Sequence, residues 1–304
     1  MAIRFQKLGD WVFDIRETFL SGYNQFYLGK SAFILTNTSE DWTLYYKVYF
    51  QNLSDTLLLV PDSTSPLTGS VEPGKASFRS FDTKYNSTTD PTGANPSYTI
   101  TGEMVIEVYQ DSGYTTLIDT ITQSVEWKII NPNNMTLIKS WDFEDLSTDG
   151  LTNNGWSQWH IIDSNEAFSG TKMLREYFYH SDPWDSLLTH EVKTLISIDL
   201  SGYTEAYLIF ARRKNYVNYS DATIINFEDF IQTDKRISLG NTLTTDGKWR
   251  KFVVPLNTSL TQVAVGFRAI VKYSHHFEAL GTERVNGYIS TEYNLDDIQI
   301  YGVA

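Results

Sequence analysis

Trp141-Asp142-Phe143-Glu144-Asp145 is the stretch around which the chain is organised, together with Asn294-Leu295-Asp296-Asp297-Ile298 close to the C-terminus. Each stretch places carboxylates beside apolar residues in a segment with the composition of a strand. Between them, strand-like runs follow one another without convincing helical periodicity. Because the first and last strands of antiparallel sandwiches often pair, we expect Glu144 and Asp297 to meet at one sheet edge. Oxygen ligands gathered there would suit Ca²⁺, which takes about six to eight of them.

The composition indicates a folded, all-β protein. A length of 304 residues favours two domains over one. The hydrophobic fraction of 41% can furnish real cores, and charged residues, at 20%, are too few for a disordered or coiled-coil chain. The sequence is also rich in Tyr and Phe, with 19 and 17 copies, and these residues favour strands.

The charge and the absence of cysteine exclude several functions. A formal net charge of −13 argues against nucleic-acid binding, which needs clustered Lys and Arg, and against docking onto anionic lipid. Without cysteine the chain has no disulfide, thiolate zinc site or cysteine nucleophile. Met1–Lys7 lacks the apolar core of a signal peptide, and no run is long enough to span a membrane. We therefore expect neither export by the general route nor membrane insertion.

Residues 1–30 form an aromatic N-terminal segment without clean alternation. It includes Trp11, Phe13 and Phe19. One interpretation is a first strand and a loop that cover the core of the first domain, since terminal segments are commonly tied down locally. The other is an arm that packs on a neighbouring subunit and stabilises an oligomer, at about 25 cal/mol per Å² of buried apolar surface.

Residues 31–130 have the pattern of an immunoglobulin-like β-sandwich, with about seven short strands separated by turns. Trp42–Phe50 alternates between apolar and polar residues. Thr83–Ser97 contains Pro91, Gly93 and Pro96 and many Ser, Thr and Asn residues, and is expected to be a long exposed loop. Thr115–Ile121 and Val125–Ile130 are predicted as the last two strands. The domain also resembles bacterial immunoglobulin-like surface modules in two motifs, Asn37-Thr38-Ser39 and Glu72-Pro73-Gly74-Lys75.

A linker at residues 131–136 is predicted to separate this domain from a second one at residues 137–304. Proline cannot continue a central strand, and asparagine favours turns, which makes Asn131-Pro132-Asn133-Asn134 the best boundary. Six short motifs then follow in order: Asp142-Phe143-Glu144, Gly155-Trp156, Ala167-Phe168-Ser169-Gly170, Gly247-Lys248-Trp249, Val263-Ala264-Val265-Gly266-Phe267 and Asp296-Asp297-Ile298. In this order they resemble the jelly-roll, concanavalin-like domains of MAM, cleaved-adhesin and carbohydrate-binding-module type.

The resemblance implies a jelly-roll β-sandwich with a structural calcium ion near its first and last strands. It implies Glu144 and Asp297 as calcium ligands, with Asp142, Ser169 and Asp296 as further ones, and it implies no catalytic residue. Two other interpretations of the acidic pair remain. The carboxylates could be solvated groups that deter edge-to-edge pairing, or the general acid and base of a glycoside hydrolase.

Aromatic and basic residues of the second domain are candidates for sugar binding, because aromatic rings stack on the apolar faces of sugars while Arg bonds their hydroxyls. The alternative is that the rings fill the core, since Trp and Tyr bury large areas in any sandwich. The candidate ligand-binding residues are Trp159, Tyr177, Tyr179, Trp184, Arg212, Arg268 and Tyr273. No Gly-rich phosphate loop, nucleophile elbow or zinc-protease motif is present, so we expect no enzymatic activity.

Three features lead to a hypothesis about function. The domains resemble extracellular adhesion and sugar-binding modules, no export signal is seen, and an aromatic segment precedes the first sandwich. A virus combines these features, because virion surface proteins are made in the host cytoplasm and leave with the particle. We therefore predict a non-enzymatic virion structural protein: a minor capsid, decoration or fibre-like surface protein of a phage or archaeal virus.

The predicted partners are other copies of the chain or other virion proteins through the N-terminal domain, and glycans or a host surface through the jelly roll. Two alternatives belong to other classes. One is a carbohydrate-binding or adhesin module of a secreted or cell-surface protein. The other is a pair of accessory domains of a glycoside hydrolase.

Overall fold

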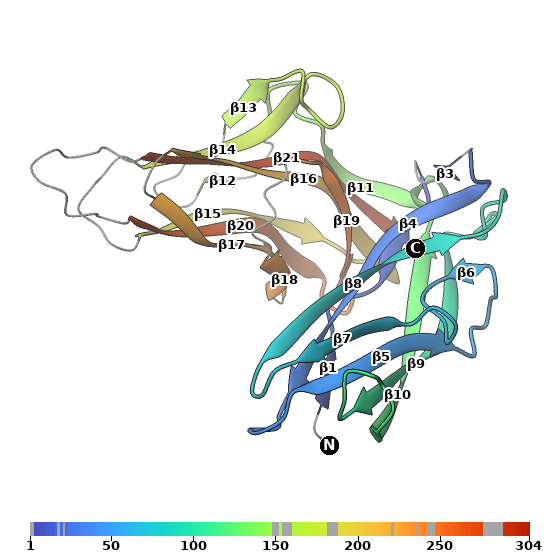
Figure 1. Ribbon diagram of the computed structural model, residues 1–304. Helices are drawn as coiled ribbons and strands as arrows, with labels where there is room; N and C mark the ends of the chain where they lie inside the picture. Colours follow the sequence, from blue (N-terminus) through green and yellow to red (C-terminus); the bar gives the residue numbers. More distant parts are fainter. Residues whose placement is uncertain are drawn as a thin grey trace, which may run out of the picture. The chain divides into compact units, whose positions relative to one another are not determined.

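A computed structural model describes residues 3–16, 19–20, 22–147, 152–153, 160–180, 188–219, 222–234, 236–241, 247–275 and 288–304 (Figure 1). The chain divides into two compact units, Met1–Met135 and Thr136–Ala304. In the described part the regular elements are strands and one short 3₁₀ helix, η1 (Pro132–Asn134), which confirms the prediction of an all-β protein. No described helix is long and apolar enough to cross a membrane.

The first unit is a sandwich of two sheets. Its strands are, in chain order, β1 (Ile3–Lys7), β2 (Val12–Asp14), β3 (Phe19–Leu20), β4 (Gln25–Asn37), β5 (Leu44–Gln51), β6 (Leu58–Leu59), β7 (Leu67–Val71), β8 (Ala76–Tyr85), β9 (Ser97–Tyr109) and β10 (Leu117–Ile130). One sheet has the order β1-β4-β8-β6 with β3 beside β4, and the other has the order β2-β10-β9-β5-β7. The relation of this sandwich to immunoglobulin-like modules stays a prediction.

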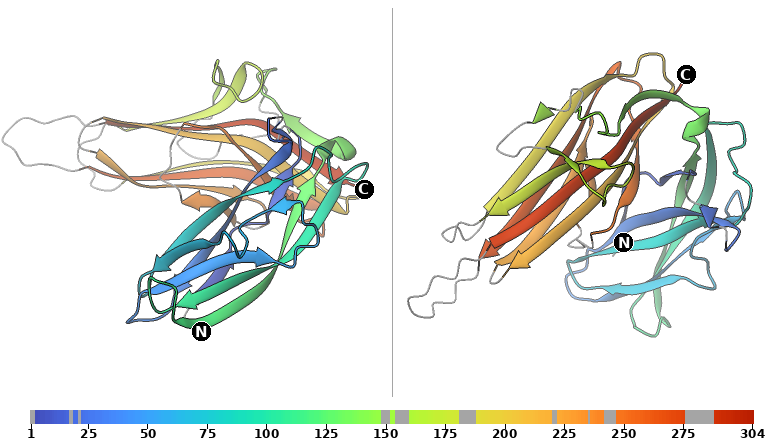
Figure 2. Two further views of the ribbon diagram at one scale, coloured as in Figure 1. Left: turned by 45° about the vertical axis from the view of Figure 1, so that its right-hand side comes forward. Right: turned by 90° about the horizontal axis from the view of Figure 1, so that it is seen from above.

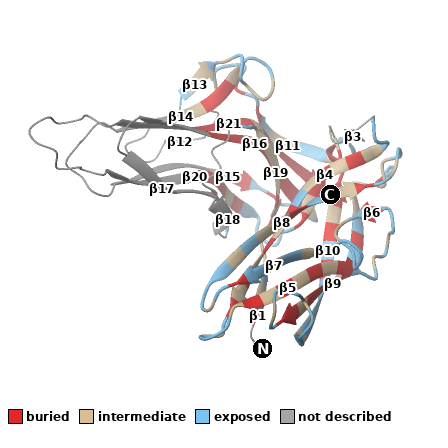
Figure 3. Cartoon of the chain, in the orientation of Figure 1, coloured by how far each residue is buried: buried red, intermediate tan, exposed pale blue. Residues whose placement is uncertain are grey.

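Alternating side chains build the core of the first unit. Along β5, the residues Leu44, Tyr46, Val48 and Phe50 are buried while their neighbours are not, as the period of two in a half-buried strand requires (Figure 3). Aromatic rings fill the centre, where the ring of Trp127 lies 5.2 Å from that of Phe50. Such tilted and edge-to-face pairs add to the free energy that burial alone supplies.

The aromatic N-terminal segment belongs to this same core. Trp11 is only 3% exposed, its ring lies 5.2 Å from that of Trp127, and its indole N–H donates to the carbonyl oxygen of Ala32 at 3.2 Å. Phe13 is buried as well. The first-strand interpretation therefore describes these residues, and the arm interpretation is wrong for Trp11 and Phe13. The side chain of Phe19 lies outside the described part.

Two local predictions in the first unit are wrong. The sequence predicted separate strands at Thr115–Ile121 and Val125–Ile130, but β10 is continuous, because the polar residues between them keep their pairing with β9. The loop predicted from Thr83 begins only after Tyr85. Thr83 is buried in β8, where its hydroxyl shares a 2.8 Å hydrogen bond with that of Ser31.

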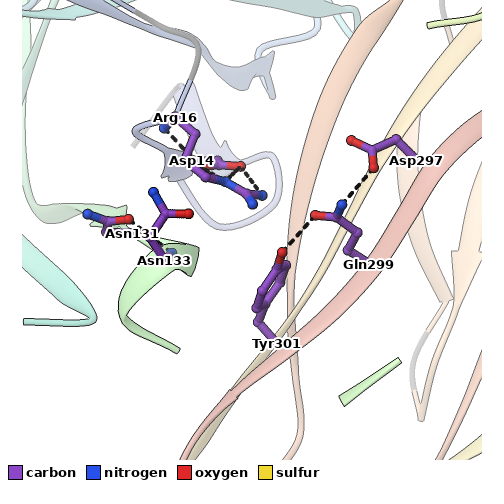
Figure 4. A network of polar contacts seen from close by, with 7 residues as sticks. All are labelled: Asp14, Arg16, Asn131, Asn133, Asp297, Gln299 and Tyr301. Atoms are coloured by element: carbon purple, nitrogen blue, oxygen red, sulfur yellow. Dashed lines mark hydrogen bonds and ion pairs between the residues drawn. The ribbon is translucent and has the colours of Figure 1, made fainter. Parts of the chain in front are cut away.

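The segment predicted as a linker is packed against the first unit. Asn131 and Pro132 are buried. The side-chain amide of Asn131 donates to Asp90 at 2.7 Å, and its oxygen accepts the backbone N–H of Asn133 at 3.1 Å (Figure 4). Asn134 donates to the carbonyl oxygens of two residues in the 90–95 loop. The turn is thus held by side-chain hydrogen bonds, whereas independent folding of the two units stays a prediction.

The second unit is a jelly-roll-like sandwich of two sheets, which appear as two layers in Figure 1. Its strands are β11 (Thr136–Trp141), β12 (Thr152–Asn153), β13 (His160–Asp163), β14 (Lys172–His180), β15 (Leu188–Asp199), β16 (Glu205–Tyr219), β17 (Ala222–Gln232), β18 (Arg236–Asn241), β19 (Arg250–Leu256), β20 (Gln262–His275) and β21 (Tyr288–Val303). One sheet has the order β13-β14-β21-β16-β19 with β11 beside β21, and the other has the order β12-β15-β20-β17-β18.

Replacing Trp11 by Ala tests the assignment of the N-terminal segment to the core. We expect a loss of about 3–5 kcal/mol in the free energy of unfolding of the first unit, because a large buried ring leaves a cavity. Tyr23→Ala is the control, since Tyr23 in the same segment is 74% exposed and should change stability by less than about 0.5 kcal/mol. Denaturant unfolding measures both. A Trp11→Ala protein of normal stability that loses self-association would restore the arm interpretation.

Candidate functional site

Asp296 and Asp297 lie where the pairing of β21 changes partners. On one side of β21, β11 ends with Trp141 opposite Ile298, and β14 takes over with Leu174 opposite Leu295. On the other side the strand bulges, because Asp297 and Ile298 together stand opposite a single residue of β16. Asp297 adopts a left-handed backbone with φ of 48°. A bulge of this kind re-aims side chains at a sheet edge.

The carboxylate of Asp296 is fully buried at this point. One oxygen accepts the backbone N–H of Ser169 at 2.9 Å, and the other accepts the backbone N–H of Asp297 at 2.7 Å. Burial raises the pKa of Asp296 to about 6, although the amides of Ser169, Asp297 and Phe168 act in the opposite direction. A group that is costly to ionise is therefore held against the 168–172 turn.

Glu144 binds the C-terminal end of the same turn. Its Oε1 accepts the backbone N–H groups of Thr171 and Lys172, both at 2.7 Å, and its Oε2 accepts the hydroxyl of Thr171 at 2.9 Å. These hydrogen bonds lower the pKa of Glu144, and the bond from the Thr171 amide has the largest effect. Gly170 has φ of 60°, and a Cβ there would collide with the Glu144 carboxylate. We call Glu144, Asp296 and the 168–172 turn the acidic corner.

The five predicted calcium ligands do not form one cluster in the structure, because they have different hydrogen-bond partners. Glu144 and Asp296 meet at the acidic corner, and Ser169 presents its backbone N–H to Asp296. Asp297 instead accepts the side-chain amide of Gln299 at 2.7 Å, and Gln299 accepts the hydroxyl of Tyr301 (Figure 4). Asp142 is exposed and accepts the backbone N–H of Glu144. Among the described residues, no three His, Asp or Glu side chains are grouped so that they could hold a metal.

The acidic corner fits calcium in the type of its donors. Two carboxylates, one of them buried, are hard oxygen ligands, and a cation beside Asp296 would offset the cost of ionising it. Calcium is coordinated by about six to eight oxygens, and two carboxylates supply at most four. Backbone carbonyls and water would have to complete the coordination shell.

A second group of polar residues crosses three strands of the same sheet. Asn294 of β21 stands opposite Arg175 of β14 on one side and Arg213 of β16 on the other. Asn294 is fully buried, and neither its Nδ2 nor its Oδ1 has a hydrogen-bond partner in the described structure. A buried amide without partners is costly, and few native side chains remain so. We call Arg175, Asn294 and Arg213 the Asn294 row.

Two carboxylates accompany the Asn294 row. Arg213 forms a 2.8 Å ion pair with Glu166, and Arg175 lies 3.6 Å from Glu292. Glu166 belongs to the loop before β14, whose position is fixed by Trp249: the indole N–H donates to the Glu166 carbonyl oxygen at 2.6 Å. Two positive and two negative groups therefore surround one amide, and the cluster carries no net charge.

The predicted ligand-binding residues that the structure describes come from both sheets of the second unit. Arg212 is only 3% exposed, and its guanidinium lies 4.7 Å from the ring centre of Phe252, so it is not on an exposed face of the unit. Its position follows from β16, where it stands opposite Leu295 of the core. Trp159 and Trp184 lie outside the described residues. So do the side chains of the remaining four, which are on β14 (Tyr177 and Tyr179) and on β20 of the other sheet (Arg268 and Tyr273).

Sequence reasoning missed Asn294 and Arg213. The run Arg212-Arg213-Lys214 was visible as three charges at a strand end, and alternation along that strand would have placed Arg213 on the face opposite to Arg212. Nothing in the sequence pairs Arg213 with Asn294, because that contact depends on the register between two strands that are far apart in the chain.

Comparison with known proteins adds little beyond the fold. No family model matches the chain, and no curated protein matches it. Similar solved structures include one described for carbohydrate-binding modules of the β-sandwich superfamily. Its sequence is 14% identical, the alignment covers 99% of this chain and 98% of the other, and the TM-score is 0.33. The xylan-binding CBM22-2 domain of Paenibacillus barcinonensis Xyn10C has 12% identity, with 55% of this chain and 99% of the domain covered and a TM-score of 0.30.

A viral structure is also among those found. Infectious bursal disease virus, Gx strain, has 9% identity to the chain, with 92% of this chain and 66% of the viral one covered and a TM-score of 0.23. Carbohydrate-binding β-sandwich modules are the class that the second half of the sequence resembles. At these identities and TM-scores, neither kind of structure says what this chain binds.

Gly170→Ala tests the hold of Glu144 on the 168–172 turn. The substitution strains a left-handed residue and drives a methyl group into the Glu144 carboxylate. Gly202→Ala is the matched control in the same unit, because Gly202 has φ of 89° and no atom near its Cβ position. We expect the control to lose about 1–2 kcal/mol through backbone strain and Gly170→Ala to lose a further 1–3 kcal/mol or so through broken hydrogen bonds. Equal losses in denaturant unfolding would show that Glu144 contributes nothing.

Proposed function

We propose that the protein is a non-catalytic binding protein whose second unit recognises a neutral glycan at the Asn294 row. One observation carries the proposal: the amide of Asn294 is buried between two arginines with its donor and its acceptor both unmatched. Ligand sites in proteins typically combine a few converging polar groups with groups that fix orientation. A sugar hydroxyl both donates and accepts, which is what an amide needs from a partner.

The charges of the site support a neutral ligand over an anionic one. Each arginine of the Asn294 row has a carboxylate partner, Glu166 for Arg213 and Glu292 for Arg175. An anion approaching the row would meet these carboxylates as well as the net charge of −13 on the chain. A hydroxyl-rich neutral ligand meets alternating donors and acceptors without that repulsion.

The Asn294 row is partly exposed on its β14 side, although Asn294 itself is buried. The side chains of Arg175 and Glu292 are 35% and 23% exposed, whereas that of Arg213 is 8% exposed beneath Glu166. A glycan would therefore contact Arg175 and Glu292 first, and a hydroxyl or a water molecule held by them would reach Asn294. Placement on a virion surface stays a prediction from the sequence, because no described contact distinguishes a virion protein from an adhesin or an accessory domain.

Arg175→Gln tests glycan recognition. We expect calorimetric titration with a neutral oligosaccharide selected on a glycan array to show about 10-fold to 100-fold weaker binding, because hydrogen bonds from a charged group are worth about 1.5–3 kcal/mol. Arg4→Gln, at an exposed position of β1 in the first unit, is the control and should bind as the unchanged protein does. The proposal fails if no neutral glycan binds, or if Arg175→Gln leaves the affinity unaltered.

We also propose a structural calcium ion at the acidic corner, held by Glu144 and Asp296 together with backbone carbonyl oxygens. The buried Asp296 carboxylate supports this, since burial and, to a smaller extent, the neighbouring charge of Asp297 raise its pKa, and a cation would favour its ionised form. The ion would supply no chemistry beyond tying the segment that follows β11 to the middle of β21. We leave Asp142 and Asp297 out of the proposed set, because their carboxylates bond the backbone N–H of Glu144 and the side chain of Gln299 rather than the 168–172 turn.

Removal of calcium should lower the melting temperature of the second unit, because an ion that binds only the folded state stabilises it by mass action. Glu144→Gln and Asp296→Asn should each abolish the difference between calcium and chelator, whereas Asp41→Asn, at an exposed site in the first unit, should keep it. Scanning calorimetry measures these shifts. A melting temperature indifferent to chelator contradicts the calcium proposal and leaves the glycan proposal standing.

The same measurement has a defined pH dependence. The pKa of Asp296 in the folded protein is raised from 3.8 to about 6. As the pH falls in the absence of calcium, Asp296 is therefore protonated in the folded state before it is protonated in the unfolded state. Without calcium, stability therefore rises as the pH falls from 7 through 6 towards 3.8. Calcium needs the ionised carboxylate, so its stabilising effect should be largest above pH 6 and fade below it.

A further inference from the structure

The last strand of the first unit has a long unpaired edge. Strand β10 pairs with β9 along nearly its whole length, but on its other side, among the residues that the structure describes, only Lys128, Ile129 and Ile130 pair, with β2. Residues 117–127 therefore border the sheet without a neighbouring strand in the described part of the first unit. In Figure 2 this green strand forms an outer edge of its sheet.

The hydrogen bonds at the end of β10 show which residues point their backbone groups outward. The N–H of Lys128 donates to the carbonyl oxygen of Trp11, and the carbonyl oxygen of Ile130 accepts the N–H of Ile15. The carbonyl oxygen of Glu126 accepts from Nζ of Lys7 at 3.5 Å. Since outward groups recur at every second residue of a strand, Thr120, Thr122 and Ser124 present the next N–H and C=O groups to the outside.

This edge lacks the usual protection against pairing. Natural edges are blocked by Lys, Pro or strong bulges. Residues 117–125 include neither Lys nor Pro, and Asp119 is their one charged residue. The β-bulge between Leu117 and Asp119 lies at the far end only. Leu117 and Ile118 are 53% and 50% exposed beside it. Lys7 covers the edge at the Glu126 end, and Arg4 is on the edge strand β1 of the other sheet.

We propose that β10 of a second copy of this chain pairs with this edge, antiparallel and about a two-fold axis at Thr122. Thr122 then faces its own counterpart, Thr120 faces the partner subunit's Ser124, and Asp119 faces the partner subunit's Val125. No like charges stand opposite each other in this register, and β-branched Thr, Ile and Val dominate it. Two five-stranded sheets become one continuous sheet.

The second copy is favoured over an unrelated strand because the edge is self-complementary. A two-fold axis applies every contact twice, so a register that is good on one side is good on both. The three outward residues provide about six backbone hydrogen bonds, two for each facing pair. This inference concerns the first unit and stands apart from glycan binding. It also gives self-association a surface, which the buried Trp11 and Phe13 do not.

Thr122→Lys tests the pairing. Sedimentation velocity of the full-length protein up to about 100 µM should show a dimer, and Thr122→Lys, which opposes two positive charges at the axis, should raise the dimer dissociation constant about tenfold or more. Ser70→Lys is the matched control, since Ser70 is an exposed residue of β7 at the opposite edge of the same sheet. It should dimerise as the unchanged protein does, and all three should share one circular dichroism spectrum.

Cysteine cross-linking tests the register, because the chain contains no other thiol. Thr122→Cys should form a disulfide-linked dimer on mild oxidation, since facing residues of a hydrogen-bonded pair lie about 5.5 Å apart at Cα. Ser70→Cys should stay unlinked. A protein that is monomeric at every concentration overturns the proposal. So does a dimer that Thr122→Lys leaves intact, or equal cross-linking of Thr122→Cys and Ser70→Cys.

Discussion

The burial of the Asp296 carboxylate is the constraint on which the second unit depends. A carboxylate without water is costly unless hydrogen-bond donors replace the solvent, and here backbone amides do so. The Ser169 amide is in place only if the 168–172 turn keeps its shape, and Gly170 and the Glu144 carboxylate hold that shape. Glu144 follows directly from β11. Three segments far apart in the sequence are thereby tied together at the point where β21 changes neighbours.

The sequence was sufficient to predict an all-β protein, two sandwiches and the pairing of the first and last strands of the second one. It was not sufficient to predict which carboxylate would be buried there. Adjacent strand residues point to opposite faces, and the bulge at Asp297 breaks that alternation. A left-handed backbone at a non-glycine residue leaves no sign in the sequence. Asn294 was missed for a related reason, since strand register is a long-range property.

The N-terminal segment shows how a change of sheet hides a strand. β1 pairs with β4 in one sheet and β2 pairs with β10 in the other, so the chain crosses the sandwich between them. The alternation of apolar and polar residues is lost at the crossing. For that reason the sequence alone allowed two interpretations of this aromatic-rich segment, a core strand or an arm. The crossing also leaves β2 only three residues in which to cover β10. The placement of Trp11 in the core and the open edge of β10 are therefore two results of one crossing.

The two proposed recognition surfaces have one physical property in common. The Asn294 row is charge-balanced, and the outward edge of β10 offers backbone groups with little charge beside them. The net charge of −13 on the chain repels anionic partners at long range, so it does not draw them to either surface. Recognition must then come from short-range hydrogen bonds, whose strength depends on geometry. Salt, which screens the repulsion between two acidic copies, should favour pairing of the β10 edges and leave the binding of a neutral glycan nearly unchanged.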